Sequence, residues 1–173
     1  MQDFFPLKKS SRLEIEMKGG SVFNLGERAS FNVIDFTFYT GEDARKSSGA
    51  FRLLKGAVNG TTGKLASLGN GMQIIGDSAT IGISGTAFGI DDMPDGALCV
   101  VNWQDGDLDV RNAKGTVRID GNGEGSEIKD GDTAPGAPKF WRHWKREFAR
   151  WTVASIPASS SARPTTGPSL GSA

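Results

Sequence analysis

The chain carries short runs in which apolar residues alternate with small or polar ones. In the clearest run, Ser78–Phe88, the odd positions from 79 to 83 are apolar and the even positions from 80 to 84 are small or polar. This period of two predicts an extended strand with one buried face. Glycine weakens a strand interior, so Gly82 and Gly85 are expected to allow close backbone approach or a bend.

Turn dipeptides separate such runs at short intervals. Asn-Gly and Asp-Gly suit the positive φ angles of tight turns, and the candidates are Gly19-Gly20, Asn59-Gly60, Asn70-Gly71, Asp95-Gly96, Asp105-Gly106, Asp120-Gly121 and Asp130-Gly131. The predicted strands are Arg12–Met17, Phe31–Tyr39, Phe51–Val58, Met72–Ile75, Ala79–Ile90, Ala97–Trp103, Leu108–Arg111 and Thr116–Ile119. This spacing predicts an all-β domain of short antiparallel or stacked strands, forming a sandwich, a roll or a solenoid-like module.

The sequence changes character after residue 133. Residues 134–138 form a Pro/Gly/Ala hinge, and residues 139–152 have the aromatic spacing of an amphipathic α-helix. That predicted helix holds three of the four tryptophans, and five basic residues against Glu147 give it a net charge of +4. We therefore expect an N-terminal arm over 1–10, a β domain over 11–133, the hinge, the Trp-rich helix and a flexible tail over 153–173.

Charge and composition narrow the range of possible partners and sites. Twenty basic residues balance twenty acidic ones, so the chain has no overall attraction to nucleic acid, which we do not expect as a partner. Cys99 is the single cysteine, which excludes an intrachain disulfide and a thiolate metal cluster. The chain shows neither a secretory signal nor an apolar stretch of membrane-spanning length.

Candidate catalytic and metal motifs are weak. The segment starting at Asp120 begins like a calcium loop, but its twelfth position is Gly131, where a bidentate Glu is needed. Asp105, Asp107 and Asp109 alternate along one strand face, for which a solvated surface is the common explanation. The only histidine, His143, lies in the basic helix with no evident link to Ser84 or Cys99. We expect no catalytic residue, bound metal or cofactor, and hence no enzyme.

Several ordered motifs resemble those of FecR-type domains. Gly20–Gly26 is similar to the family's "DGS-x-x-x-LG" segment, Asp35–Tyr39 to its "D-x-F-x-Y" strand, and Leu54–Ala57 with Thr62–Lys64 to its "L-x-K-G-A…(S/T)GK" pair. Residues 79–86 resemble its most recognisable motif, "ATIGIRGT", carried here by Ile81, Gly82, Ile83, Ser84, Gly85 and Thr86. Gly106–Asn112 resembles the strand that follows. The resemblance extends from about Ser11 to Gly131.

The resemblance implies a non-enzymatic β module, periplasmic or extracellular in its relatives. Because the chain carries no signal peptide, a cytoplasmic protein or a fragment stays open. Ser84 departs from the family pattern, which places Arg there, so an ion pair made by that buried or interfacial Arg is lost. The family's role as a transducer to a sigma factor needs an anti-sigma segment and a membrane helix, which this sequence lacks, so we expect binding or scaffolding instead.

The Trp-rich helix is the expected functional surface. We predict a structural or interaction protein that docks into a larger homo- or hetero-oligomeric assembly through this helix and the tail. The predicted contact residues are Phe140, Trp141, Trp144, Lys145, Phe148, Arg150 and Trp151. The alternatives are peripheral binding of the same basic face to a membrane surface, as a signalling regulator, and packing of the aromatic face back onto the β domain.

Overall fold

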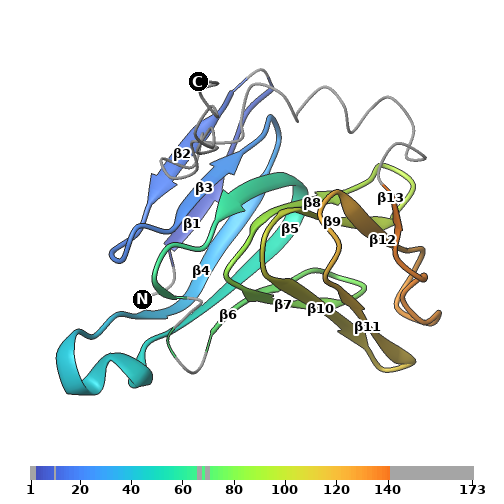
Figure 1. Cartoon of the computed structure of the whole chain (residues 1–173). Helices are drawn as coiled ribbons and strands as arrows, with labels where there is room; N and C mark the ends of the chain where they lie inside the picture. The colour runs from blue at the N-terminus through green and yellow to red at the C-terminus, as the bar shows by residue number, and fades with distance from the viewer. Residues whose placement is uncertain (1–2, 10, 66–67, 69–70, 141–173) are drawn as a thin grey trace, which may run out of the picture.

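A computed structural model describes residues 3–9, 11–65, 68 and 71–140 of the chain. Within these residues, thirteen strands and one short 3₁₀ helix, η1 (Gly41–Lys46), make up the regular structure (Figure 1). The first seven strands are β1 (Asp3–Pro6), β2 (Leu13–Glu16), β3 (Val22–Leu25), β4 (Ser30–Thr37), β5 (Ser48–Thr61), β6 (Met72–Ile75) and β7 (Thr80–Ser84). The others are β8 (Ala87–Asp92), β9 (Leu98–Gln104), β10 (Asp107–Asn112), β11 (Gly115–Ile119), β12 (Glu124–Ile128) and β13 (Lys139–Phe140).

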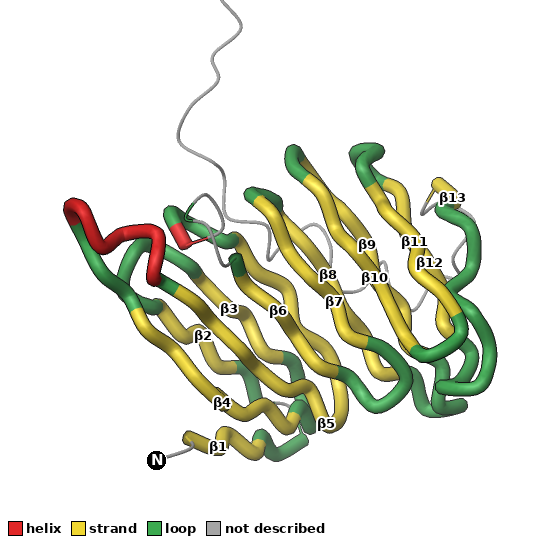
Figure 2. The backbone as a smooth tube through the Cα atoms, turned by 90° about the horizontal axis from the view of Figure 1, so that it is seen from below, coloured by secondary structure: helices red, strands yellow, loops and turns green. Residues whose placement is uncertain are grey.

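The strands form two sheets that share β5. Sheet A has the order β1-β4-β5-β6-β7-β10-β11, and sheet B has the order β2-β3-β5-β8-β9-β12-β13. All pairs are antiparallel except β5 with β6. Figure 1 shows β7, β10 and β11 in one layer and β8, β9 and β12 in the other. Figure 2 shows the strands side by side along the molecule, with β1 near one end and β13 at the other. The predicted all-β class is confirmed, and the two sheets are parts of one continuous, curled sheet of thirteen strands.

A glycine lies where β5 passes from sheet A to sheet B. Lys55 is the last residue of β5 paired with β4, and Gly56 is the first paired with β8. Gly56 has φ +79°, and a Cβ on it would lie 2.8 Å from the Ala29 Cα. A side chain there would be both strained and blocked by backbone, so the crossing of β5 requires glycine.

The core lies between the two sheets. Sheet A contributes Phe31 and Phe51 and sheet B contributes Phe23 and Phe88, all fully buried. The Phe23 ring centroid lies 4.7 Å from that of Phe51 and 5.4 Å from that of Phe31, so the aromatic contacts join the two sheets. Apolar residues at alternating strand positions, such as Ile81, complete this single core.

Two predicted boundaries of strands and turns are wrong. Ala79–Ile90 is not one strand: β7 belongs to sheet A and β8 to sheet B, because the chain turns at Gly85, which has φ +69°. Asn59-Gly60 is not a turn but lies within β5, where a Cβ on Gly60 would lie 2.9 Å from the Phe88 ring. The expected N-terminal arm, 1–10, contains β1, which pairs with β4. Of the expected helix, 139–152, only Lys139 and Phe140 are among the described residues, and they form the strand β13.

Candidate functional site

The family-motif residues serve the fold. Ile81 and Ile83 on β7 are buried in the core, and Gly82 between them faces outward. Ser84 is exposed at the end of β7, opposite Asp107 on β10. The position at which the family places Arg is therefore a surface position in this chain.

Thr86 and Asn102 form a buried polar link next to this motif. The Thr86 Oγ1 lies 2.5 Å from the Asn102 Oδ1, to which it can donate, and 2.7 Å from the Gln104 carbonyl oxygen. The Asn102 Nδ2 donates to the carbonyl oxygens of Gly106 at 3.0 Å and of Ile119 at 3.4 Å. Asn102 belongs to sheet B and Ile119 to sheet A, so one fully buried amide joins the two sheets. This pairing meets the hydrogen-bonding needs of buried polar groups.

The outer face of sheet A is hollowed into a polar groove of about 410 Å³. Its floor follows one cross-strand row, Asp35-Ala50-Gln73-Gly82-Asp109. Gly82 and Ala50 bring little or no side chain to this row, which leaves the space of the groove open, and a Cβ on Gly82 would meet nothing closer than 3.8 Å. The groove can hydrogen-bond a polar ligand through Asp35, Gln73 and Asp109, and Arg111 also lines it.

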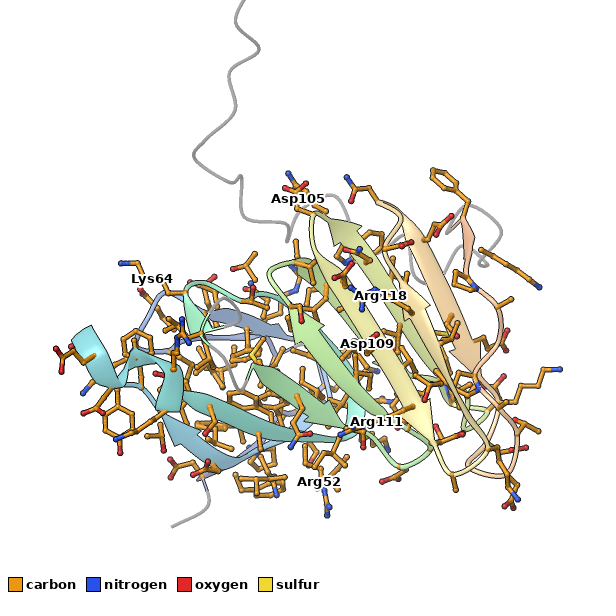
Figure 3. The ribbon with its side chains drawn as sticks, turned by 60° about the horizontal axis from the view of Figure 1, so that its bottom comes forward. Arg52, Lys64, Asp105, Asp109, Arg111 and Arg118 are labelled. Atoms are coloured by element: carbon orange, nitrogen blue, oxygen red, sulfur yellow. The ribbon has the colours of Figure 1, made fainter. Side chains whose placement is uncertain are left out.

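Charged side chains continue this row across β10 and β11, as Figure 3 shows for Asp109 and Arg118. The Arg118 guanidinium pairs with the Asp107 carboxylate and lies 3.6 Å from the Asp109 carboxylate. Asp105 lies in the β9–β10 turn, with its backbone N–H bonded to the Asn122 Oδ1 at 2.9 Å. Among the described residues, no three His, Cys, Asp or Glu side chains converge on a possible metal position.

The outer face of sheet B carries an apolar cluster outside the core. Cys99 and Val101 on β9 point away from the core and are buried, with Met93 and Trp103 packed against them. We call these four residues the outer cluster. The Trp103 indole N–H donates to the Asn59 Oδ1 at 3.2 Å.

Glycines make room for the outer cluster. Across the strands, Val101 is flanked by Gly89 on β8 and Gly125 on β12. A Cβ on Gly89 would lie 2.7 Å from the Trp103 Nε1, and one on Gly125 would lie 3.0 Å from the Val101 Cγ2. Bulkier residues at either position would push these side chains off the sheet.

The thiol of Cys99 is held in its neutral form. Burial raises its pKa to about 12, and the nearby carboxylates Glu127, Asp91 and Asp95 add to the rise because they repel a thiolate. A thiol of this kind is a poor nucleophile at neutral pH. The same three carboxylates make the surroundings of the outer cluster acidic.

Of the predicted contact residues, the structure describes only Phe140. It lies on β13, opposite Glu124, with 45% of its surface exposed. Trp141, Trp144, Lys145, Phe148, Arg150 and Trp151 lie outside the described residues, as do His143 and the tail. In the described part of the chain, no helix has the length and apolar character to cross a membrane.

Sequence reasoning missed Asn102 and the outer cluster. Asn102 is a single polar residue within the apolar run of β9, which is the one signal that could have indicated a buried polar link. The outer cluster follows from a run that is apolar on both faces, because Cys99 and Val101 alternate with the core residues Leu98 and Val100. Such a run indicates a strand covered on both sides.

Comparison with known proteins identifies the family and the fold. Two crystal structures described as a "putative anti-sigma factor" from Parabacteroides distasonis ATCC 8503 are similar, with TM-scores of 0.62 and 0.61 at 11% and 12% identity. The matches cover 81% and 80% of this chain but only 60% and 59% of those chains, so this chain spans about three fifths of their length. No curated protein sequence matches at a significant level. The sequence profile of the FecR protein family matches residues 7–118, well over half of the chain, and the protein therefore belongs to the FecR family.

Proposed function

We propose that this protein is a non-enzymatic interaction module of a regulatory system, which docks onto a protein partner through its Trp-rich segment, residues 139–152, and the tail. The observation that carries the proposal is where the chain leaves the β domain. Lys139 and Phe140 form an edge strand on β12, so the aromatic sequence that follows starts at the surface of sheet B. Aromatic residues dominate the energetics of protein interfaces.

The chemistry of the β domain supports a binding role over catalysis. Its buried polar side chains Thr86 and Asn102 are committed to the link between the sheets. The carboxylates of Asp107 and Asp109 on β10 form ion pairs with Arg118. The similar crystal structures are described as a "putative anti-sigma factor", which supports a regulatory role. By the same family relationship, we propose a periplasmic or extracellular site of action.

The experiment compares the full chain with the variant W141A/W144A/W151A. Both proteins are expressed in the native host, cross-linked, and analysed by mass spectrometry for cross-links between this chain and other proteins. We expect specific cross-links from the unchanged chain and their loss in the Trp variant. The matched control, F4A/Y39A, removes two exposed aromatic side chains of the β domain, outside the proposed docking surface, and should retain the cross-links. Equal cross-linking of the Trp variant and the unchanged chain would refute the proposal.

A membrane surface is the second candidate partner, favoured by the net charge of +4 on residues 139–152. Basic aromatic segments lie in the headgroup region of anionic bilayers, and their binding weakens with salt. Co-sedimentation of the full chain with vesicles containing phosphatidylglycerol, across a range of salt concentrations, separates the two candidates. Salt-sensitive pelleting that requires the tryptophans would favour the membrane, and its absence would leave the protein partner.

A further inference from the structure

The floor of the groove on sheet A contains a glycine that the fold does not require. Gly82 lies in the middle of β7, and its φ is outside the left-handed region, so other residues can adopt its backbone conformation. A Cβ on Gly82 would meet nothing closer than 3.8 Å, so a side chain would also have space. Because glycine weakens a strand interior, what Gly82 supplies in return is the open space of the groove.

We propose that this groove binds a neutral carbohydrate chain, with one sugar ring seated over Gly82. Its volume of about 410 Å³ lies within the range of small-molecule sites, about 300–1,000 Å³. The groove is on sheet A, whereas the chain continues from β13 on sheet B, so the inference goes beyond the proposed function and does not depend on it. Three properties of the groove favour this ligand.

The first property is a mixture of hydrogen-bond donors and acceptors around Gly82. Gln73 on β6 and Asp109 on β10 lie on either side of it, two strand spacings or roughly 10 Å apart. Arg111 follows Asp109 by two residues on the same face of β10 (Figure 3). Within the described part of the chain, the side chains of Gln73 and Arg111 have no hydrogen-bond or ion-pair partner. These groups suit a ligand whose hydroxyls both donate and accept.

The second property is the balance of charge along the groove. Asp35 on β4 and Asp109 on β10 lie four strand spacings apart, roughly 19 Å. An anionic ligand along the groove would meet both carboxylates. A cationic ligand would meet Arg111, and also Arg118, whose guanidinium lies 3.6 Å from the Asp109 carboxylate. Neither sign of charge is complementary to the whole groove, so a neutral ligand fits it best.

The third property is that the groove crosses interior strands. In sheet A, β5, β6, β7 and β10 each pair with a neighbour on both sides, so their backbone N–H and C=O groups are used within the sheet. An extended peptide usually binds by adding to an edge strand, where backbone groups are free. On this face its backbone would find only side chains as partners. The hydroxyls of a sugar chain need only such side chains, which favours carbohydrate over peptide.

The first test is whether the fold requires glycine at position 82. The Gly82→Gln variant places a side chain over the floor of the groove. The control, Ser84→Gln, adds the same side chain to the same face of β7, at an exposed position outside the groove. In urea unfolding of the full chain, we expect Gly82→Gln to have a midpoint equal to or above that of the unchanged protein. A lower midpoint would show that the fold needs this glycine and would overturn the proposal.

The second test is binding, measured by saturation-transfer difference NMR with the full chain. The sugar probes are maltohexaose, cellohexaose, xylohexaose and chitohexaose, and the comparison probes are tetraalanine, citrate and spermidine. We expect at least one sugar to bind. Its affinity should fall about tenfold or more in Gly82→Gln and change by less than about twofold in Ser84→Gln.

Three results of the binding test would overturn the proposal. They are the absence of binding by all four sugars, tighter binding of the peptide or of either ion than of any sugar, and sugar binding that Gly82→Gln leaves unchanged. Residues 139–152 are the same in all three proteins, so the result is independent of the cross-linking experiment on the Trp variant.

Discussion

Replacement of Asn102 by alanine should destabilise the protein by more than the loss of one hydrogen bond would. The Asn102 amide makes three contacts in a fully buried position: with the Thr86 hydroxyl, the Gly106 carbonyl and the Ile119 carbonyl. Each hydrogen bond contributes about 0.5–1.5 kcal/mol, and the two carbonyls would each lose the donor that the amide supplies. We therefore expect the N102A variant to lose about 3 kcal/mol of unfolding free energy, or about 6–12 °C in Tm for a chain of this size.

The assay is urea unfolding of the full chain, followed by far-ultraviolet circular dichroism. The m-value should stay constant, because the change affects a link between sheets and leaves the surface exposed on unfolding the same. The control is Asn122→Ala, since Asn122 is exposed and its side chain accepts one backbone N–H from Asp105 at 2.9 Å. That change should cost about 0.5 kcal/mol, at the lower end for one hydrogen bond.

A double-mutant cycle with Thr86→Val tests the link itself. If the Thr86 Oγ1 and the Asn102 Oδ1 form one unit, the two changes together should cost less than the sum of the single changes, by about 1 kcal/mol. Strict additivity, or a cost for N102A no larger than for Asn122→Ala, would refute the interpretation of this pair as the polar link between the sheets.

Three further predictions follow from the geometry. Gly56→Ala should lower the unfolding free energy by about 2 kcal/mol or more, because it adds a clash with the Ala29 backbone to the strain of a positive φ. Gly85→Ala has open space around it and should lower the unfolding free energy only by the roughly 1–2 kcal/mol of strain. Equal unfolding midpoints for the two variants would contradict this difference. The raised pKa of Cys99 predicts that alkylation of the full chain keeps accelerating with pH until about pH 12, and that stability falls above about pH 9, where the unfolded thiol ionises; a plateau near pH 9 would be inconsistent with it. Arg118→Gln should change the unfolding free energy by less than about 1 kcal/mol, since the Arg118 side chain is 57% exposed. A larger loss, measured by urea unfolding, would show that the ion pairs with Asp107 and Asp109 contribute to stability.

Alternation alone gives much of the fold, because strands with one buried face have a fixed period of two. Met72–Ile75 matches β6 residue for residue, and seven of the eight predicted runs each coincide with one strand within a few residues. The eighth, Ala79–Ile90, continues the alternation through Gly85, and periodicity carries no information on a change of sheet. The strand β12 was missed because Glu124–Ile128 holds a single large apolar residue, and its position is set by pairing with β9.

The candidate site was less predictable than the fold. Asn59-Gly60 has the composition of a turn, but the pairing of β5 with β3 and β8 overrides that local preference. The groove on sheet A is lined by Asp35 and Asp109, which are 74 residues apart in the sequence. Four successive cross-strand pairs place them at opposite ends of one row. Residues that form a site only through such long-range pairing leave no local signal in the sequence.

The location of the family motif shows that its residues have a structural role, which does not depend on the partner that a particular protein binds. Ile81 and Ile83 fill the core, and Thr86 contacts the amide that joins the sheets, so the motif is a requirement of the fold. A motif of this kind identifies the fold and carries no information about the partner. Partner choice must come from surfaces outside the core, and here the matched residues, 7–118, end before the exit strand β13 and the Trp-rich segment. Partner binding is therefore best tested outside the motif, and the proposed Trp-rich segment, residues 139–152, is the first segment to change.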